Sequence, residues 1–279
     1  MPTGAHERGR LRLIAPLLRA SHFPPSLAVT AFTTALAART GTPRQAARVG
    51  AAVLCGQLAV GWTNDFLDRD DDIAAARADK PIAAGEVPPT LVRNCAVAAT
   101  VLSVPLSLRF GGRAGLVHLA AVGSGLAYDA GLKRSALSVL PYVSAFGAFP
   151  AFVAMAVAPD RRPSIVPSVA GALLGAGAHF VNVVPDIASD VEAGILGLPQ
   201  RLGSSNSILA GAALMAASAA VVATSNGRAG VLAKACLAAN AAALSAVVIT
   251  QRLGRERLAW KLALATAGTT VALHLTGER

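Results

Sequence analysis

The chain alternates long apolar stretches with short breaks rich in charged residues, Pro and Gly. The apolar stretches are continuous and show no period of two, so they predict helices rather than the strands of a membrane barrel. Their length and their many Gly and Ala residues are typical of helices that pack closely in lipid. We predict nine spans, near residues 25–40, 45–66, 90–108, 114–128, 138–158, 165–184, 205–225, 229–250 and 257–276.

Composition supports this pattern. Hydrophobic residues make up 54% of the 279 residues and charged residues 14%, which is too apolar for a soluble domain. We therefore expect an all-α polytopic membrane protein with about nine transmembrane helices. Residues 1–279 are predicted to form one integral-membrane domain, of which residues 1–11 are flexible.

The distribution of charge excludes one class of partner and suggests an orientation. The net charge is +10, but the basic residues are scattered singly or in pairs, so we do not expect nucleic acid binding. When alternate loops are placed on opposite sides, 15 of the 25 Lys and Arg residues fall on the side of the N-terminus. The positive-inside rule then predicts a multi-pass protein of the cell (inner) membrane with this side in the cytoplasm.

The acids are concentrated far more than the bases. Of the 15 Asp and Glu residues, seven lie within residues 65–86 and three within residues 186–192. Both groups are in loops predicted on the same, cytoplasmic side of the membrane. We therefore expect the two groups to face each other across one cavity.

The first acidic segment, residues 64–72, ends the second predicted span. If the helix continues through it, Asp65, Asp68 and Asp72 lie at positions i, i+3 and i+7, on one face with Asn64 at its margin. Converging carboxylates repel one another, and a divalent cation removes that repulsion. Oxygen ligands of this kind suit Mg²⁺, which takes one or two carboxylates together with phosphate oxygens and water. The segment thus predicts a Mg²⁺ site for a diphosphate.

A solvated acidic loop is the alternative interpretation of the same residues. We favour it for Asp70 and Asp71, because most runs of charge are solvated. For Asp65, Asp68 and Asp72 the metal site is favoured, because Asn64-Asp65 ends an apolar span, where ionisable groups are costly and usually functional.

The second acidic segment, residues 182–194, has a similar pattern. Asn182, Asp186 and Asp190 are spaced by four residues, which places them on one helical face, although Pro185 is expected to bend the helix. Two carboxylate edges that face each other can hold Mg²⁺ ions on a diphosphate and neutralise its charge as it leaves. A polar linker between two spans is the alternative.

Basic residues lie in two loops on the same predicted side. Residues 77–81 contain Arg77 and Lys80, and residues 128–134 contain Tyr128, Lys133 and Arg134. Cations beside membrane helices need no special purpose. Next to two acidic segments, however, they are candidates for binding the diphosphate.

These motifs together resemble the UbiA superfamily of intramembrane prenyltransferases. Asn64-Asp65-x-x-Asp68-x-x-x-Asp72 is similar to the first motif of the family, and Asp186-x-x-x-Asp190-x-x-x-Gly194 is similar to the second. Lys80-Pro81 lies where the family more often has Arg-Pro. Residues 128–134 resemble its Tyr-Lys-Arg loop, and residues 194–203 look most like the quinone-pathway branch. Pro185 departs from that branch, which often carries Arg at this position.

The resemblance implies a fold and a reaction. It implies nine helices around a lateral cavity, Mg²⁺ as cofactor, and a polyprenyl diphosphate that forms an allylic carbocation. A lipophilic acceptor in the membrane, expected to be aromatic, would then capture the prenyl group. It further implies that Asp65, Asp68, Asp72, Asp186 and Asp190 are the catalytic metal ligands, with Asn64 as a further ligand. The diphosphate would be bound by Arg77, Lys80, Tyr128, Lys133, Arg134 and Asn182.

Three functions remain open for the chain itself. A transferase needs an acceptor pocket, for which Gln57 and His179 are weak candidates, although a lone His is more often satisfied by a neighbour. A terpene cyclase on the same scaffold would quench the cation with the prenyl chain's own double bonds. An aromatic stripe at residues 142–152 suits either activity or mere packing; its members are Tyr142, Phe146, Phe149 and Phe152. A cation transporter would carry acids within its spans or an inverted repeat, and neither is evident.

Overall fold

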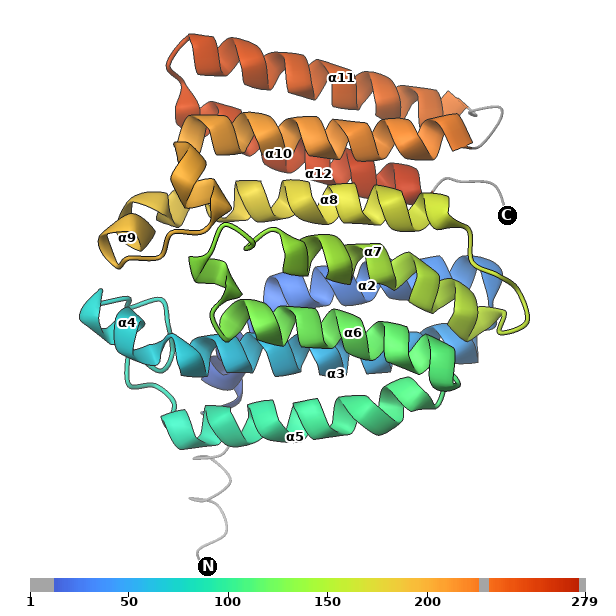
Figure 1. The fold of residues 1–279 in the computed structure, drawn as a ribbon, viewed down its shortest axis with the longest axis horizontal. Helices are drawn as coiled ribbons and strands as arrows, with labels where there is room; N and C mark the ends of the chain where they lie inside the picture. The colour runs from blue at the N-terminus through green and yellow to red at the C-terminus, as the bar shows by residue number, and fades with distance from the viewer. Residues whose placement is uncertain (1–12, 226–230, 276–279) are drawn as a thin grey trace, which may run out of the picture.

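The described part of the protein is a bundle of long helices, and the segments that connect these helices lie at the two ends of the bundle (Figure 1). The computed structural model describes residues 13–225 and 231–275. The predicted flexible segment, residues 1–11, lies outside them. Within the described residues, nine helices have at least 18 residues: α2 (Phe23–Thr40), α3 (Pro43–Leu67), α5 (Pro89–Leu108), α6 (Gly112–Asp129), α7 (Leu140–Val157), α8 (Ile165–Asn182), α10 (Leu198–Ser225), α11 (Val231–Arg252) and α12 (Glu256–His274).

These nine helices coincide with the nine predicted stretches to within a few residues, except that α10 begins earlier. Gly203, inside α10, has a left-handed φ of 77°, so the first part of α10 is a separate turn and the long helix starts where the span was predicted. Among the described residues, five helical segments are long and apolar enough to cross a membrane, namely Pro89–Leu108, Leu140–Val157, Ile165–Glu192, Leu198–Thr224 and Lys234–Arg252. The other long helices are less apolar than that.

Local sequence signals explain where the helices begin and end. Thr42 caps α3: its Oγ1 accepts from the Gln45 N–H, and Gln45 Oε1 accepts from the Thr42 N–H. Pro43 occupies the first turn of α3, where its missing N–H costs nothing. Ser164 caps α8 in the same way through the Val166 N–H.

Helix α8 lies between α7 and α10 and packs closely on both. Glycine makes this possible: a Cβ on Gly175 would lie 2.5 Å from the Tyr142 carbonyl oxygen, and one on Gly177 would lie 2.7 Å from the Gly211 carbonyl oxygen. Small residues of this kind let helix backbones touch in lipid, where packing rather than hydrophobic burial joins helices. The contact fixes the position of α8, which carries the second acidic segment, relative to α7.

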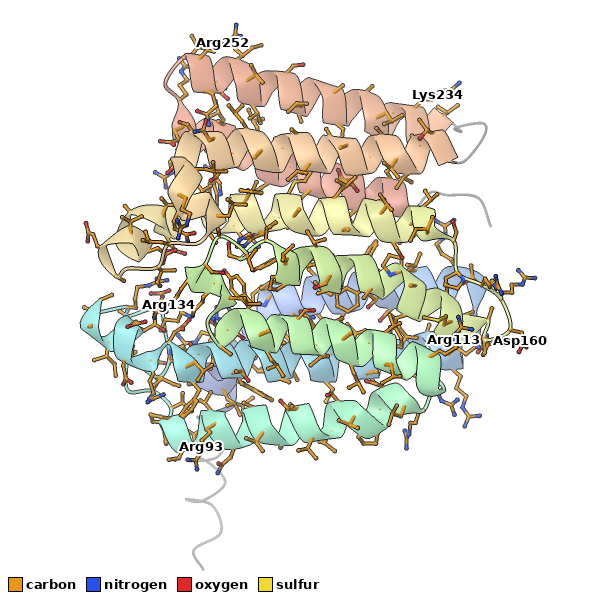
Figure 2. The ribbon with its side chains drawn as sticks, in the orientation of Figure 1. Arg93, Arg113, Arg134, Asp160, Lys234 and Arg252 are labelled. Atoms are coloured by element: carbon orange, nitrogen blue, oxygen red, sulfur yellow. The ribbon has the colours of Figure 1, made fainter. Side chains whose placement is uncertain are left out.

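Both acidic segments lie at the same end of the bundle, which we call the acidic end (Figure 1). The short helices α4 (Arg69–Ala74) and α9 (Ile187–Glu192) project from it. Figure 2 shows Arg134 and Arg252 at this end and Arg113 and Asp160 at the opposite end, as alternation of the loops predicts. Which side of the membrane the acidic end faces stays a prediction.

Candidate functional site

The helix does not continue unbroken through the first acidic segment. Helix α3 ends at Leu67 and α4 begins at Arg69, with Asp68 at the junction. Backbone hydrogen bonds nevertheless bridge the junction, from the Asp68 N–H to the Asn64 carbonyl at 2.9 Å and from the Asp72 N–H to the Asp68 carbonyl at 2.8 Å. The interruption of the helix is therefore slight. Lys80 lies beside Asp65 and Asp72, and Lys133 pairs with Asp68.

The second break is deeper. Helix α8 ends at Asn182, a 3₁₀ turn covers Val184–Asp186, and α9 follows. Asn182, Asp186 and Asp190 therefore do not lie on one unbroken helix, and the bend expected at Pro185 is confirmed. Pro185 is the physical reason, because it has no N–H for the helix ladder and its ring clashes with the preceding turn.

Lys80 lies at the centre of the first acidic segment. Its Nζ is 3.5 Å from Asp65 Oδ1 and 3.8 Å from Asp72 Oδ2, and it hydrogen-bonds His22 Nε2 at 3.1 Å. Asp65 is 1% exposed, and neither of its carboxylate oxygens has a hydrogen-bond partner among the described residues. Burial raises the pKa of Asp72, and the charge of Lys80 opposes that rise.

Lys133 and Arg134 come from the 3₁₀ turn Leu132–Arg134 and reach across to the same segment. Lys133, which is 7% exposed, pairs with Asp68, and Arg134 pairs with Asp71. Both were predicted to bind diphosphate. The solvated interpretation of Asp71 is incomplete, because its carboxylate has this ion pair.

Arg77 joins the two acidic segments. Its Nη1 is 3.5 Å from Asp186 Oδ1, and the same guanidinium donates two hydrogen bonds of 2.9 Å to Asp79. These hydrogen bonds lower the pKa of Asp79 to about 2. Position 185 holds Pro, so the cation beside Asp186 comes instead from the loop at residues 77–81. The Arg77 N–H also donates to the Asp72 carbonyl at 3.0 Å, so Arg77 contacts the first acidic segment through its backbone and the second through its side chain.

The second acidic segment has fewer partners. Asp190 Oδ2 accepts from Gln200 Nε2 at 2.7 Å. Asn182, predicted to bind diphosphate, is exposed, and no hydrogen bond joins it to the site in the described part of the chain. Asp186 and Asp190 are half-buried, in contrast to Asp65.

The aromatic candidates form a row that leads away from the acidic end. Tyr128 and Tyr142 meet edge to face at 5.3 Å, and Tyr142 stacks on Phe146 at 6.2 Å, which contacts Phe149 at 6.1 Å. Phe149 is buried in the core between α3, α6 and α7. For this part of the stripe, packing explains the residue fully.

Phe152 and His179 have equally clear neighbours. Phe152 is fully buried and stacks on His118 at 4.6 Å, so it belongs to the same core. His179 Nε2 hydrogen-bonds Ser138 Oγ at 3.0 Å, and its ring lies 4.6 Å from that of Tyr142. The acceptor role of His179 stays a prediction, as does that of the half-buried Gln57.

Two residues of the site were missed in the sequence. Asp129, 5% exposed, accepts a hydrogen bond from Asn64, and Gln200 holds Asp190. An acid at the end of an apolar span is the signal that could have found Asp129. Gln200 lies within residues 194–203, which carry part of the resemblance, but its uncharged side chain in the first turn of α10 gives no sign that Asp190 is its partner.

The carboxylates are separated by cations rather than gathered into a closed cage. No group of three or more His, Cys, Asp or Glu side chains in the described residues could hold a metal ion alone. The donor set still fits Mg²⁺ with a phosphate ligand, because Asp65 and Asp72 carry buried carboxylate oxygens without a hydrogen-bond partner. Such oxygens are costly unless a cation meets them.

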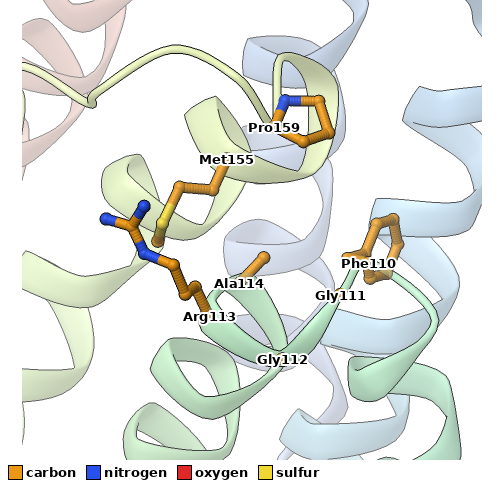
Figure 3. Close-up of a pocket in the computed structure, with 7 residues that line it drawn as sticks. All are labelled: Phe110, Gly111, Gly112, Arg113, Ala114, Met155 and Pro159. Atoms are coloured by element: carbon orange, nitrogen blue, oxygen red, sulfur yellow. The ribbon is translucent and has the colours of Figure 1, made fainter.

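Neither of the two described pockets is lined by these carboxylates. One of about 180 Å³ opens at the end of the bundle opposite the acidic end, between the start of α6 and the end of α7 (Figure 3). Another of about 270 Å³ lies between α3 and α5. The predicted central cavity stays a prediction.

The fold and the site define a polytopic helical membrane protein whose charged site joins two helix breaks at one end of the bundle. The sequence profile described as the UbiA prenyltransferase family matches residues 26–272. The chain therefore belongs to the UbiA prenyltransferase family and is a multi-pass membrane transferase of prenyl groups. No curated protein gives a significant sequence match.

Solved structures share the fold at low sequence identity. A structure of digeranylgeranylglyceryl phosphate synthase is 13% identical, with 95% of this chain and 98% of that chain covered and a TM-score of 0.72. A UbiA homologue from Aeropyrum pernix K1 is 22% identical, with 93% and 96% covered and a TM-score of 0.66. A UbiA homologue from Archaeoglobus fulgidus bound to GPP and Mg²⁺ is 17% identical, with 92% and 99% covered and a TM-score of 0.66.

Proposed function

We propose that this chain is a Mg²⁺-dependent prenyltransferase that ionises a polyprenyl diphosphate and transfers the prenyl group to a lipophilic, aromatic acceptor in the membrane. The observation that carries the proposal is the contact of Arg77 with both acidic segments, through its N–H to the Asp72 carbonyl at 3.0 Å and its Nη1 to Asp186 Oδ1 at 3.5 Å. The Archaeoglobus fulgidus homologue bound to GPP and Mg²⁺ supports the same ligands here.

The residues divide into metal ligands and phosphate ligands. Asn64, Asp65, Asp68, Asp72, Asp186 and Asp190 would hold Mg²⁺, which when bound neutralises the charge of the leaving diphosphate. Lys80 and Lys133 sit among these carboxylates and would turn to the phosphate oxygens. Arg77 and Arg134 would bind the outer side of the diphosphate.

The aromatic row gives the prenyl chain a path. It starts at Tyr128 beside the acidic end and continues through Tyr142 to Phe146. Ring faces can stabilise an allylic cation, and apolar edges can line its tail. The acidic end would face the cytoplasm of the cell (inner) membrane, where water-soluble diphosphate can leave.

An assay of the purified protein separates the proposed functions. The protein is mixed with Mg²⁺ and geranyl, farnesyl or geranylgeranyl diphosphate, with and without a membrane lipid extract as acceptor source, and products are read by mass spectrometry. A transferase forms prenylated product when the extract is present, and EDTA abolishes it. Release of a hydrocarbon or alcohol without extract would instead identify a terpene cyclase.

A further inference from the structure

Asp129 is a buried carboxylate to which the proposed chemistry gives no task. It is the last residue of α6, and its side chain faces α3 across a gap of 65 residues in the sequence. Oδ1 accepts a hydrogen bond from Asn64 Nδ2 at 3.0 Å, and Oδ2 is buried without a hydrogen-bond partner in the described residues. Asn64 is thus the side chain to which Asp129 is tied.

The neighbours of Asn64 determine how its amide is turned. Nδ2 donates to Asp68 Oδ2 at 2.9 Å and to Asp129 Oδ1 at 3.0 Å, so each of its two hydrogens has an acceptor. Carboxylate oxygens accept and the amide NH₂ donates, so the NH₂ must lie between the two acids. The amide oxygen consequently faces the other way, where Lys80 Nζ lies 3.5 Å from it.

We propose that Asp129 is a positioning residue that fixes this orientation and so presents the Asn64 oxygen, rather than its NH₂, to the bound cation. The inference rests on the proposed function, in which Asn64 is a Mg²⁺ ligand. Without the Asp129 acceptor, one hydrogen of the Asn64 amide loses its hydrogen-bond partner. The Asn64 amide could then rotate and turn its NH₂ group toward the cation, which repels the partial positive charge of those hydrogens.

The chemistry of the carboxyl group is what makes the orientation unique. An amide or a hydroxyl at position 129 can donate as well as accept, so it would satisfy either rotamer of Asn64. The helix end that carries Asp129 is itself fixed, because the Ala130 N–H bonds the Leu126 carbonyl at 2.9 Å and α6 packs on α3 and α7. Groups that orient a metal ligand typically contribute about 10–100-fold to metal affinity.

The test measures metal binding rather than turnover. The full-length protein in detergent is titrated with Mn²⁺ alone, and free Mn²⁺ is followed by electron paramagnetic resonance. We expect Asp129→Asn, which keeps the shape but can donate, to weaken Mn²⁺ binding about 10-fold. Asp70→Asn removes an exposed carboxylate of the same acidic segment and serves as the charge-matched control. It should bind Mn²⁺ as the wild type does.

A double-mutant cycle shows whether Asp129 acts through Asn64. In an Asn64→Ala background, Asp129→Asn should cause no further loss of Mn²⁺ affinity, because the amide it orients is gone. A second loss of about the same size would overturn the inference and assign a purely electrostatic role to Asp129. Wild-type Mn²⁺ affinity in the single Asp129→Asn variant would also overturn it.

Failure of the proposed function gives a different pattern. If the wild-type chain binds no Mn²⁺, or if Asp68→Asn binds it unchanged, the metal site itself is wrong. If Asp68→Asn loses binding while Asp129→Asn keeps it, the metal site stands and the positioning role of Asp129 falls.

Discussion

The two acidic segments meet at one end of the bundle but are held in place very differently. In the first, Lys80 and Lys133 pair with its carboxylates and Asn64 bridges Asp68 to α6. In the second, Asp186 has a shared guanidinium at 3.5 Å and Asp190 has one amide. The side chains of the first acidic segment are thus held in place before a ligand binds, whereas those of the second segment have few contacts. Prearranged groups lose little freedom when a ligand binds, so the first segment should dominate turnover.

The largest expected effect comes from removing a carboxylate of the first acidic segment. Asp68→Ala removes a carboxylate that pairs with Lys133 and accepts from Asn64, and should lower turnover by about 100-fold or more, because residues that merely support a metal ligand already contribute 10–100-fold. Product formation per purified, folded protein measures this, with Asp70→Ala as control. Near-normal activity of Asp68→Ala would contradict the site.

Removing the Arg77 cation beside Asp186 should have the next largest effect. Arg77→Gln removes the cation shared by Asp79 and Asp186 and should raise the KM for the prenyl diphosphate about 10-fold, which corresponds to the loss of one charge-assisted contact. Arg77→Lys should recover part of the loss, because a lysine keeps the charge without the fork. Arg93→Gln, at the same end of the bundle, is the control. An unchanged KM would show that Arg77 does not reach the ligand.

Removing a contact of the second acidic segment should lower turnover by less. Gln200→Ala removes the hydrogen bond to Asp190 at 2.7 Å, and we expect a loss of turnover of roughly three- to tenfold, as for one hydrogen bond to a charged group with partial replacement by water. Gln200→Glu should be worse than Gln200→Ala, because a second carboxylate repels Asp190. A loss in Gln200→Ala as large as that in Asp68→Ala would reverse the ranking of the two segments.

The smallest effect concerns pH. Burial raises the pKa of Asp72 and Lys80 lowers it, so removing Lys80 in Lys80→Met raises that pKa further. Asp72 must be ionised to meet a cation, so the loss of activity on acidification should begin at a higher pH in the variant. The shape of the kcat/KM profile at low Mg²⁺ measures this independently of its height. A profile that moves to lower pH would contradict the assigned contact.

Much of the fold could be predicted because the apolar stretches of a membrane helix can be recognised directly in the sequence. Apolar stretches located the nine long helices to within a few residues, apart from the start of α10, and alternation of their loops placed both acidic segments at one end. The bend at Pro185 could be expected from that residue, but the break at Asp68 could not, since ideal helical spacing assumes an unbroken helix. Pattern predicts where helices lie better than where they fail.

The partners within the site depend on contacts that spacing does not encode. Lys133 meets Asp68 and Asp129 meets Asn64 from 65 residues away, and Gln200 reaches Asp190 through a turn. The resemblance supplied the residue types of both motifs but not the pairing of their cations with particular acids. Asp129 and Gln200 matter through geometry that arises when α6 and α10 dock on their neighbours.

The backbone contact at Gly175 separates two properties of a ligand pocket that are often coupled. Because Gly175 of α8 rests on the Tyr142 carbonyl of α7, backbone atoms help to fix the spacing of these two helices. The room along the proposed prenyl path is set instead by side chains such as Phe146, whose ring belongs to the aromatic row. If the aromatic row lines the tail of the substrate, tail length can be retuned one ring at a time while the head group stays anchored.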